Sequence, residues 1–288
     1  MSDVKLSTLN DYRARIGRVI YWLEGHLDEE IEPAELARIA SFSMYHFHRI
    51  FRAMTGDSVM GYVRRLRLER AAHKLRHSED GVLEVALESG YSSHEGFTRA
   101  FHRQFGAAPS TFRQGVGPRM RDAFERLHLM ESLDVSVRTI EAQAFVCKRH
   151  IRPYHEAGDA WQDVWCEMQK VNPRFVANMQ CVGRYYGDPD ITPEDKLRFD
   201  VGVLYEPGMV VPEGFRKEVL TEKMWAVILH RGSYDTILDA YLQLVGHWFP
   251  QSGYEVGFGP CVERYINLPS GVSSEDELLT EVWAPVAQ

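Results

Sequence analysis

Apolar residues in the first third of the chain recur every three or four positions, a spacing that predicts amphipathic helices. The segment 43–56 shows this most clearly, because Ser43 suits the start of a helix and Gly56 suits its end. One face of this helix is apolar and is formed by Phe47, Ile50, Phe51 and Met54. The opposite face carries hydrogen-bonding and basic side chains, namely Tyr45, His48, Arg49 and Arg52.

A shorter helix is predicted just upstream, at residues 33–40, and only Ser41 and Phe42 separate the two. A short helix, a tight turn and a second helix with an aromatic and basic outer face form the pattern of a helix-turn-helix. Further helices are predicted at residues 9–27 and 58–76. The second of these has a row of basic residues that we interpret either as a solvated face or as phosphate contacts: Arg64, Arg65, Arg67 and Lys74.

The helix-turn-helix pattern occurs twice. A short helix at 81–89 and a longer one at 93–106 repeat it at an offset of 50 residues. The identical pairs are Ser43/Ser93, Phe47/Phe97, Arg49/Arg99, Phe51/Phe101 and Gly56/Gly106. The first turn has Ser41 where the second has Gly90, so we expect the first turn to be strained or differently shaped.

The pattern changes after the breaker run G-V-G-P at 115–118, where we place a domain boundary followed by a helical connector at 119–131. Alternating apolar residues then predict strands, interrupted by a helix at 158–169 and another at 236–249. The strands are expected at 135–140, 144–150, 181–186, 199–205, 225–230, 260–266 and 280–284.

A second internal repeat, at an offset of 80 residues, runs through this part of the chain. The identical pairs include His150/His230, Tyr154/Tyr234, Asp159/Asp239, Ala160/Ala240, Cys181/Cys261, Arg184/Arg264 and Tyr185/Tyr265. Two repeats of mainly antiparallel strands with one helix each predict a duplicated α+β domain with a ligand groove between its halves. The fold class is therefore α, with two helix-turn-helix units joined by a long helix, plus α+β.

One position breaks this symmetry, because Gly183 in the first repeat corresponds to Glu263 in the second. We expect the glycine to leave room where the other half supplies a carboxylate. A carboxylate on an apolar and aromatic strand face needs a partner, either an internal base such as Arg184 or Arg264 or a cationic ligand. The aromatic residues that we expect around such a ligand are Trp161, Trp165, Tyr185, Tyr265 and Trp283, with Tyr154 and Tyr234 as further candidates.

Composition narrows the class of protein. The hydrophobic content of 44% excludes a disordered chain, and neither a membrane span nor a signal peptide is visible, so we expect a cytoplasmic protein. Of the net charge of −8, residues 1–117 contribute about +1 (16 Lys and Arg, 15 Asp and Glu) and the remainder about −9 (17 and 26). The four cysteines form no C-x-x-C pair and are interpreted as buried free thiols, with no metal and no cofactor.

The front part of the chain, residues 11–114 with the closing P-S-T-F-R at 109–113, resembles the DNA-binding domain of the AraC/XylS family of transcription regulators. The resemblance implies that the second helix of each unit enters a major groove of promoter DNA. The residues that it assigns to DNA are Ser43, Tyr45, His48, Arg49, Ser93, His94, Glu95, Thr98 and Arg99. Chemistry favours Arg49 and Arg99, which can each pair bidentately with guanine.

The back part resembles the GyrI-like effector-binding domain through H-R-G-S-Y at 230–234, S-G-Y-E at 252–255, G-P-C-V-E-R-Y at 259–265 and T-E-V-W-A-P-V at 280–286. This resemblance implies a small-molecule pocket in which Glu263 contacts lipophilic cations. The whole arrangement is similar to the Rob-type branch of AraC regulators. We expect a DNA-binding domain at 8–114, a linker at 115–132 and an effector domain at 133–288.

The sequence therefore predicts a transcription regulator that is not an enzyme. Its expected partners are double-stranded promoter DNA, RNA polymerase and a small amphipathic or cationic effector, with no membrane contact. The alternative is that the C-terminal domain is a small-molecule hydrolase, with Glu263 activating water, or a protein-interaction module.

Overall fold

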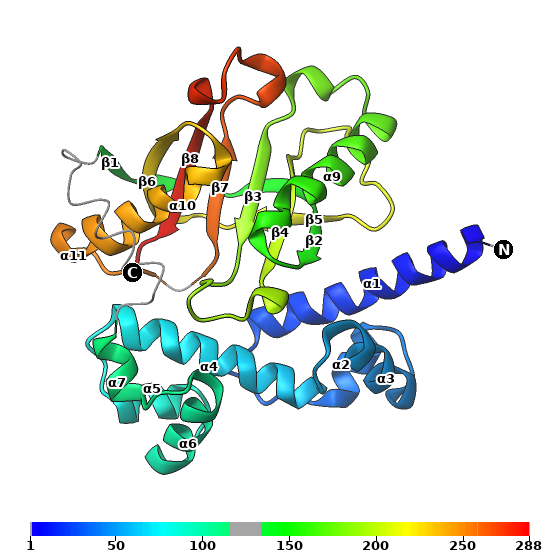
Figure 1. Cartoon of the computed structure of the whole chain (residues 1–288). Helices are drawn as coiled ribbons and strands as arrows, with labels where there is room; N and C mark the ends of the chain where they lie inside the picture. Colours follow the sequence, from blue (N-terminus) through cyan, green and yellow to red (C-terminus); the bar gives the residue numbers. More distant parts are fainter. Residues whose placement is uncertain (1, 116–133, 258, 288) are drawn as a thin grey trace. The chain divides into compact units, whose positions relative to one another are not determined.

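The computed structural model describes residues 2–115, 134–257 and 259–287. The chain divides into two compact units, Met1–Gly115 and Val116–Gln288 (Figure 1). The expected linker, 115–132, lies outside the described residues except for Gly115, as does the helical connector expected at 119–131. No helix in the described ranges combines the length and apolar character needed to cross a membrane.

The N-terminal unit is helical, and every helix predicted there is confirmed. Figure 1 shows α2 and α3 near the start of the long helix α4, and α5 and α6 near its end. The helices are α1 (Ser2–Gly25), α2 (Pro33–Ile39), α3 (Met44–Thr55), α4 (Val59–His77), α5 (Val82–Glu88), α6 (His94–Phe105) and α7 (Pro109–Gln114).

Local capping sets the ends of α3 and α6. Ser43 Oγ accepts a hydrogen bond from the backbone N–H of His46, and Ser93 Oγ does the same for Gly96 at 3.1 Å. Both helices end at a glycine in the left-handed region, with φ of 77° at Gly56 and 72° at Gly106. The predicted caps are confirmed at all four ends.

Aromatic residues form the core of each helix-turn-helix unit. Phe47 and Phe51 of α3 are fully buried, and the Phe51 ring lies edge-on to Tyr62 of α4 with centroids 5.4 Å apart. Phe97 and Phe101 take the same places in α6. The 50-residue repeat therefore preserves the buried face of α3 in α6, and the opposite face of each helix points outward.

The C-terminal unit is built on an antiparallel sheet in the order β1-β6-β8-β7-β3-β4-β2-β5. All seven predicted strands are confirmed, and β5 was not predicted. The bounds are β1 (Val135–Ile140), β2 (Gln143–Ile151), β3 (Cys181–Tyr185), β4 (Arg198–Leu204), β5 (Arg216–Leu220), β6 (Lys223–Arg231), β7 (Cys261–Tyr265) and β8 (Leu279–Pro285). The central pair, β3 and β7, places Gly183 directly opposite Glu263.

Helices cover one face of this sheet. Helix α9 (Ala157–Val171) packs on β2 and β4 through Ala160, Val164 and Met168. The second helix was predicted at 236–249, and this segment is helical but is not one continuous α-helix. It consists of α10 (Ile237–Tyr241), the π-helix η5 (Leu242–Trp248) and α11 (Phe249–Ser252). Its buried side chains pack over β6 and β8.

Candidate DNA-reading helices and effector site

The two turns of the helix-turn-helix units share a left-handed residue. Gly90 has φ of 80°, and Ser41 has φ of 52°, a conformation unusual for a residue with a side chain. The carbonyl of Ser41 accepts a 3.0 Å hydrogen bond from Arg15 of α1. The expected strain at Ser41 is confirmed, and the Arg15 contact is one interaction that holds this turn.

The outer face of α3 presents Tyr45, His48 and Arg49, all exposed, with Tyr45 at 67%. Arg49 Nη1 donates to the Tyr45 hydroxyl at 3.1 Å, and its guanidinium lies 5.6 Å from the centre of the tyrosine ring. The hydrogen bond and the cation–π contact join the two exposed side chains. Both side chains are therefore presented together on the surface.

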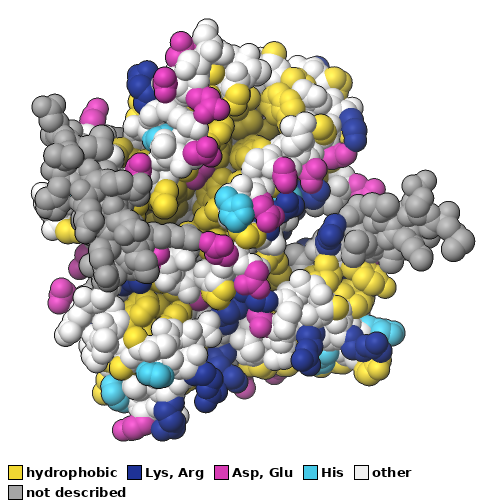
Figure 2. All heavy atoms as spheres, viewed as in Figure 1, with side chains coloured by type: hydrophobic (Ala, Val, Ile, Leu, Met, Phe, Trp, Pro, Cys, Tyr) yellow, Lys and Arg dark blue, Asp and Glu magenta, His cyan; other side chains and the backbone are white. Residues whose placement is uncertain are grey.

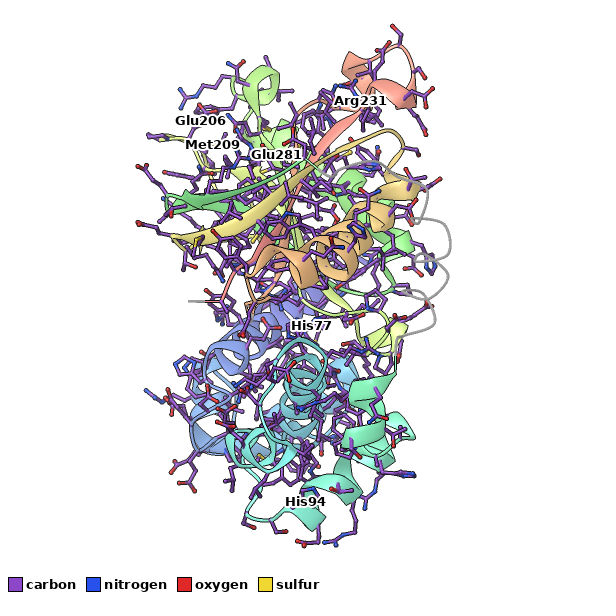
Figure 3. The ribbon with its side chains drawn as sticks, turned by 90° about the vertical axis from the view of Figure 1, so that its left-hand side faces the viewer. His77, His94, Glu206, Met209, Arg231 and Glu281 are labelled. Atoms are coloured by element: carbon purple, nitrogen blue, oxygen red, sulfur yellow. The ribbon has the colours of Figure 1, made fainter. Side chains whose placement is uncertain are left out.

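The outer face of α6 presents His94, Glu95 and Arg99, which are exposed; Figure 3 shows His94 at the surface of the unit. Thr98 differs from the expectation. Its hydroxyl is buried and makes no hydrogen bond within the described part of the chain, so in this rotamer it does not present a polar group to a base. Ser43 and Ser93 use their hydroxyls as helix caps, so their side chains hold the helix ends.

The basic residues of α4 mostly bind the protein itself. Arg65 is buried, ion-paired with Glu69 at 2.8 Å and with Asp57 at 3.2 Å. Arg67 donates to the carbonyls of Leu27 and Glu29, and Lys74 is paired with Glu88. The buried Arg65 is therefore not part of a solvated face, whereas the contacts of Lys74 with Glu88 and of Arg67 with Glu29 are exposed. Arg64 is exposed.

Glu263 lies at the centre of the sheet face that carries the helices, and it is only 4% exposed. The hydroxyl of Tyr241 donates to Glu263 Oε1 at 2.9 Å, and the hydroxyl of Tyr265 donates to Oε2. The Tyr185 hydroxyl lies 3.0 Å from that of Tyr265. Because Tyr265 directs its proton to the carboxylate, Tyr185 is the donor in that pair.

Burial raises the pKa of the Glu263 carboxyl above its ordinary value, and the hydroxyls of Tyr265, Tyr241 and Tyr185 act in the opposite sense. Burial and the neighbouring Glu263 carboxylate raise the pKa of each of these tyrosines well above 10. The tyrosines therefore remain proton donors, and Glu263 is the group in this cluster that is poised to change charge.

The space opposite Glu263 is not open. A Cβ added to Gly183 would lie 2.7 Å from Cε2 of Tyr185, because the Tyr185 ring folds back over the glycine. The ring stacks on Phe199 with centroids 5.7 Å apart. Gly183 therefore leaves no open space opposite Glu263, because the Tyr185 ring occupies the place of the missing side chain.

Aromatic side chains of the helices and turns surround the cluster. Trp161 and Tyr234 both pack edge-on against Tyr265, with centroids 5.0 Å and 5.3 Å away, and Trp165 is part of the same apolar cluster. Figure 2 shows hydrophobic side chains lining a hollow between the helices on this face. The sequence analysis did not include Tyr241 among the residues of this site. Tyr241 is 80 residues after Trp161, so the repeat places it at the position that matches an expected site residue.

Three expectations about this site are wrong. Trp283 is 1% exposed and lies on the other face of the sheet, because it pairs with Val262, whose side chain points away from that of its neighbour Glu263. For the same reason Arg184 and Arg264 do not reach Glu263. Arg184 binds Asp200 at 2.9 Å and Arg264 binds Gln180 at 2.8 Å.

The cysteines are free. Cys147 and Cys181 are buried as expected, but Cys166 is exposed and Cys261 is half-buried. Across the described ranges, no group of three or more His, Cys, Asp or Glu side chains is arranged to hold a metal ion.

Two domain profiles match separate stretches of the chain. The profile of the GyrI-like small molecule binding domain matches residues 133–287, and that of a helix-turn-helix domain matches residues 36–115. The chain is similar to the uncharacterized HTH-type transcriptional regulator YbfP of Bacillus subtilis, with 36% identity over 102 residues, 35% of each chain. It is also similar to the right origin-binding protein of Escherichia coli, with 34% identity over 118 residues, 38% of this chain and 41% of that protein.

The chain thus covers well under two thirds of the length of these relatives. Among solved structures, the C-terminal domain of EcmrR is similar at 19% identity and a TM-score of 0.46, over 55% of this chain and 99% of that one. The profile match at 133–287 covers more than half of the chain. The protein belongs to the family that carries a GyrI-like small-molecule-binding domain, here preceded by an AraC-type helix-turn-helix domain.

Proposed function

We propose that this protein is a transcription regulator that reads promoter DNA with α3 and α6 and responds to a cationic small molecule bound at Glu263. The observation that carries the proposal is the pairing of two capped, outward-facing recognition helices with a separate unit that buries a carboxylate among aromatic rings. Its proposed site of action is the cytoplasm, with RNA polymerase as a further partner.

The residues proposed to read bases are those that remain exposed on the two helices. Arg49 and Arg99 supply forked donors that match guanine O6 and N7, and Tyr45, His48, His94 and Glu95 are further candidates. Figure 2 shows Lys, Arg and His side chains together on the surface of the N-terminal unit. Phosphate contacts from such side chains would supply sequence-independent affinity, and the two recognition helices would supply specificity.

The effector is proposed to be a cation because Glu263 is buried and its hydrogen-bond partners among the described residues are tyrosines, with no basic side chain. A cation within the cluster would favour the ionised carboxylate, and the rings of Trp161, Trp165, Tyr185 and Tyr265 would offer their π-faces. For the effector to regulate, it must bind one arrangement of the protein more tightly than another.

The organisation that we propose is a reader at 8–114, a linker at 115–132 and an effector domain at 133–288 that arose by internal duplication. The strand order supports the duplication. Strands β2, β3 and β4 are neighbours in one half of the sheet, β6, β7 and β8 are neighbours in the other, and the halves meet at the β3–β7 pair. The first strand of each proposed half is exchanged, because β1 pairs with β6 and β5 pairs with β2.

The test begins with selection of the preferred DNA site by the full-length protein from a random library. We expect Arg99→Ala to relax the preference at one base position, by about 1–3 kcal/mol of lost discrimination. Arg64→Ala, which removes an exposed arginine of α4, is the matched control and should leave the selected sequence unchanged. Equal weakening of all sequences by Arg99→Ala would contradict a base-reading role.

A further inference from the structure

Two tyrosines 80 residues apart use their hydroxyl groups differently. The Tyr154 hydroxyl donates to the carbonyl of Gly187 and accepts from its backbone N–H, both at 2.9 Å. Tyr234 is the residue at the matching position of the second repeat. Its hydroxyl is buried and makes no hydrogen bond to any residue that the structure describes.

A second buried donor lies in the same cluster. The Nε1–H of Trp161 has no hydrogen bond of acceptable geometry in the described ranges, although the indole is close enough to influence the Tyr185 hydroxyl. The rings of Trp161 and Tyr234 both pack edge-on against Tyr265. Tyr265 in turn donates to Glu263, so both unused donors adjoin the carboxylate cluster.

Neither donor is explained by packing alone. Burying a donor without a partner destabilises the folded protein, and native structures contain few such groups. A phenylalanine at position 234 would provide the same ring contact without that cost. Burial, with the nearby Cys181 and Glu263, raises the pKa of Tyr234 to about 12, so its hydroxyl keeps its proton. The Glu263 carboxylate already accepts a hydrogen bond from Tyr241 on one oxygen and from Tyr265 on the other.

We propose that the Tyr234 hydroxyl and the Trp161 Nε1–H form a subsite for a hydrogen-bond acceptor beside Glu263. The effector would then be a cation that also carries an acceptor such as a carbonyl oxygen, with the positive charge at Glu263 and the acceptor at Tyr234. This inference rests on the proposed cation site and narrows its ligand class. A purely hydrocarbon cation would leave both donors buried and unpaired.

The test uses two cations that differ by one group, phenylbutyl-triphenylphosphonium and benzoylpropyl-triphenylphosphonium, in which a carbonyl replaces the last methylene. Calorimetry with the full chain should show the ketone binding about three- to tenfold more tightly. Tyr234→Phe should remove that preference, and Trp161→Phe should reduce it. Tyr154→Phe is the matched control and should keep the preference.

Thermal unfolding gives an independent readout of the two tyrosines. Tyr234→Phe should be no less stable than the wild type. Tyr154→Phe loses the hydrogen bonds of its hydroxyl to Gly187 and Arg198 and should unfold at lower temperature. Equal binding of both cations by the wild type, or an unchanged preference in Tyr234→Phe, would overturn the acceptor subsite. Glu263→Gln distinguishes failure of the acceptor subsite from failure of the cation site. The variant should lower the affinity for both cations alike, and unchanged affinity for both would show that the cation site itself is wrong.

Discussion

Gly183 and Glu263 face each other across the β3–β7 pair, and the difference between them decides what fills the centre of the sheet. The missing side chain at 183 admits the Tyr185 ring, which brings the Tyr185 hydroxyl to Tyr265 and so extends the hydrogen-bonded cluster around Glu263. A residue without side-chain chemistry thus positions one of the donors of the site.

Gly183→Ala should therefore displace the Tyr185 ring. The added Cβ would lie 2.7 Å from Cε2 and 3.2 Å from Cζ, too close for the present rotamer. We expect a loss of about 1–3 kcal/mol of stability, the usual cost of overpacking. Five of the six tryptophans, all except Trp22, lie in the C-terminal unit, so fluorescence-detected urea unfolding of the full chain reports mainly on this unit.

Two further variants separate the clash from other effects. Gly158→Ala adds a Cβ that meets nothing within 4 Å, so it should not destabilise the unit. In a Tyr185→Ala background the clashing ring is gone, and Gly183→Ala should then cost much less. An unchanged cost in that background would show that the glycine is required for another reason.

At this scale the sequence predicted the residues whose roles are local. The caps at Ser43 and Ser93 and the strained turn at Ser41 follow from conformational preferences within a few residues. The buried hydroxyl of Thr98 and the opposite-face position of Trp283 depend on rotamer and strand register, which are set by distant segments. Alternation along β7 shows which face carries Glu263, but it does not show which face of the sheet carries Trp283 of β8. That depends on the register in which the two strands pair.

Among the elements, β5 shows where pattern analysis fails. Its sequence, R-K-E-V-L, lacks the apolar alternation of a half-buried strand. The strand is nonetheless held at the sheet edge by a buried ionic cluster. Arg216 of β5, Arg149 of β2 and Arg184 of β3 all bind Asp200 of β4, which is fully buried on the face away from Glu263. This cluster joins four strands and was not predicted, because its members are distant in sequence.

Asp200→Asn should destabilise the C-terminal unit by about 3–5 kcal/mol, because it leaves several buried arginines facing a neutral group. Burial alone would raise the pKa of Asp200, but Arg149, Arg216 and Arg184 hold it well below its ordinary 3.8. Its stabilisation is therefore present at neutral pH and is lost as the pH falls below that ordinary value. Urea unfolding followed by tryptophan fluorescence measures the change.

The control is Asp163→Asn on the exposed side of α9, which should change stability little. A loss below about 1 kcal/mol in Asp200→Asn would mean that the arginines are solvated or paired well enough without the carboxylate.

The π-helix η5 is the second element that the pattern missed, since apolar spacing does not distinguish an α-helix from a local widening of the turn.

For the whole molecule, the proposed function requires that occupancy at Glu263 alters DNA binding, and thermodynamic linkage makes that effect reciprocal. If the effector changes the affinity for DNA by a given factor, DNA must change the affinity for the effector by the same factor. The sequence predicts two domains from its two sets of repeated residues, at offsets of 50 and 80. It could not predict how strongly the two are coupled, since no local pattern encodes a coupling free energy.

The charge state of Glu263 provides a test of the cation site. Because its pKa is raised above 4.5 in the folded protein, ionisation of Glu263 lowers stability as the pH rises through that pKa. A cation favours the ionised form, so the affinity for tetraphenylphosphonium should rise with pH, about tenfold per unit below the pKa, and then level off. Calorimetry in two buffers of different ionisation enthalpy should detect proton release over the rising part.

The ligand is permanently charged, so a pH dependence must come from the protein. The other groups facing Glu263 keep their protons at neutral pH: the pKa values of Tyr185, Tyr241 and Tyr265 lie well above 10, and burial raises the pKa of Cys261 to about 12. Glu263→Gln should therefore bind weakly on both sides of the Glu263 pKa, with no proton release. If this variant kept the slope of the wild type, the cation would be binding at another acidic group.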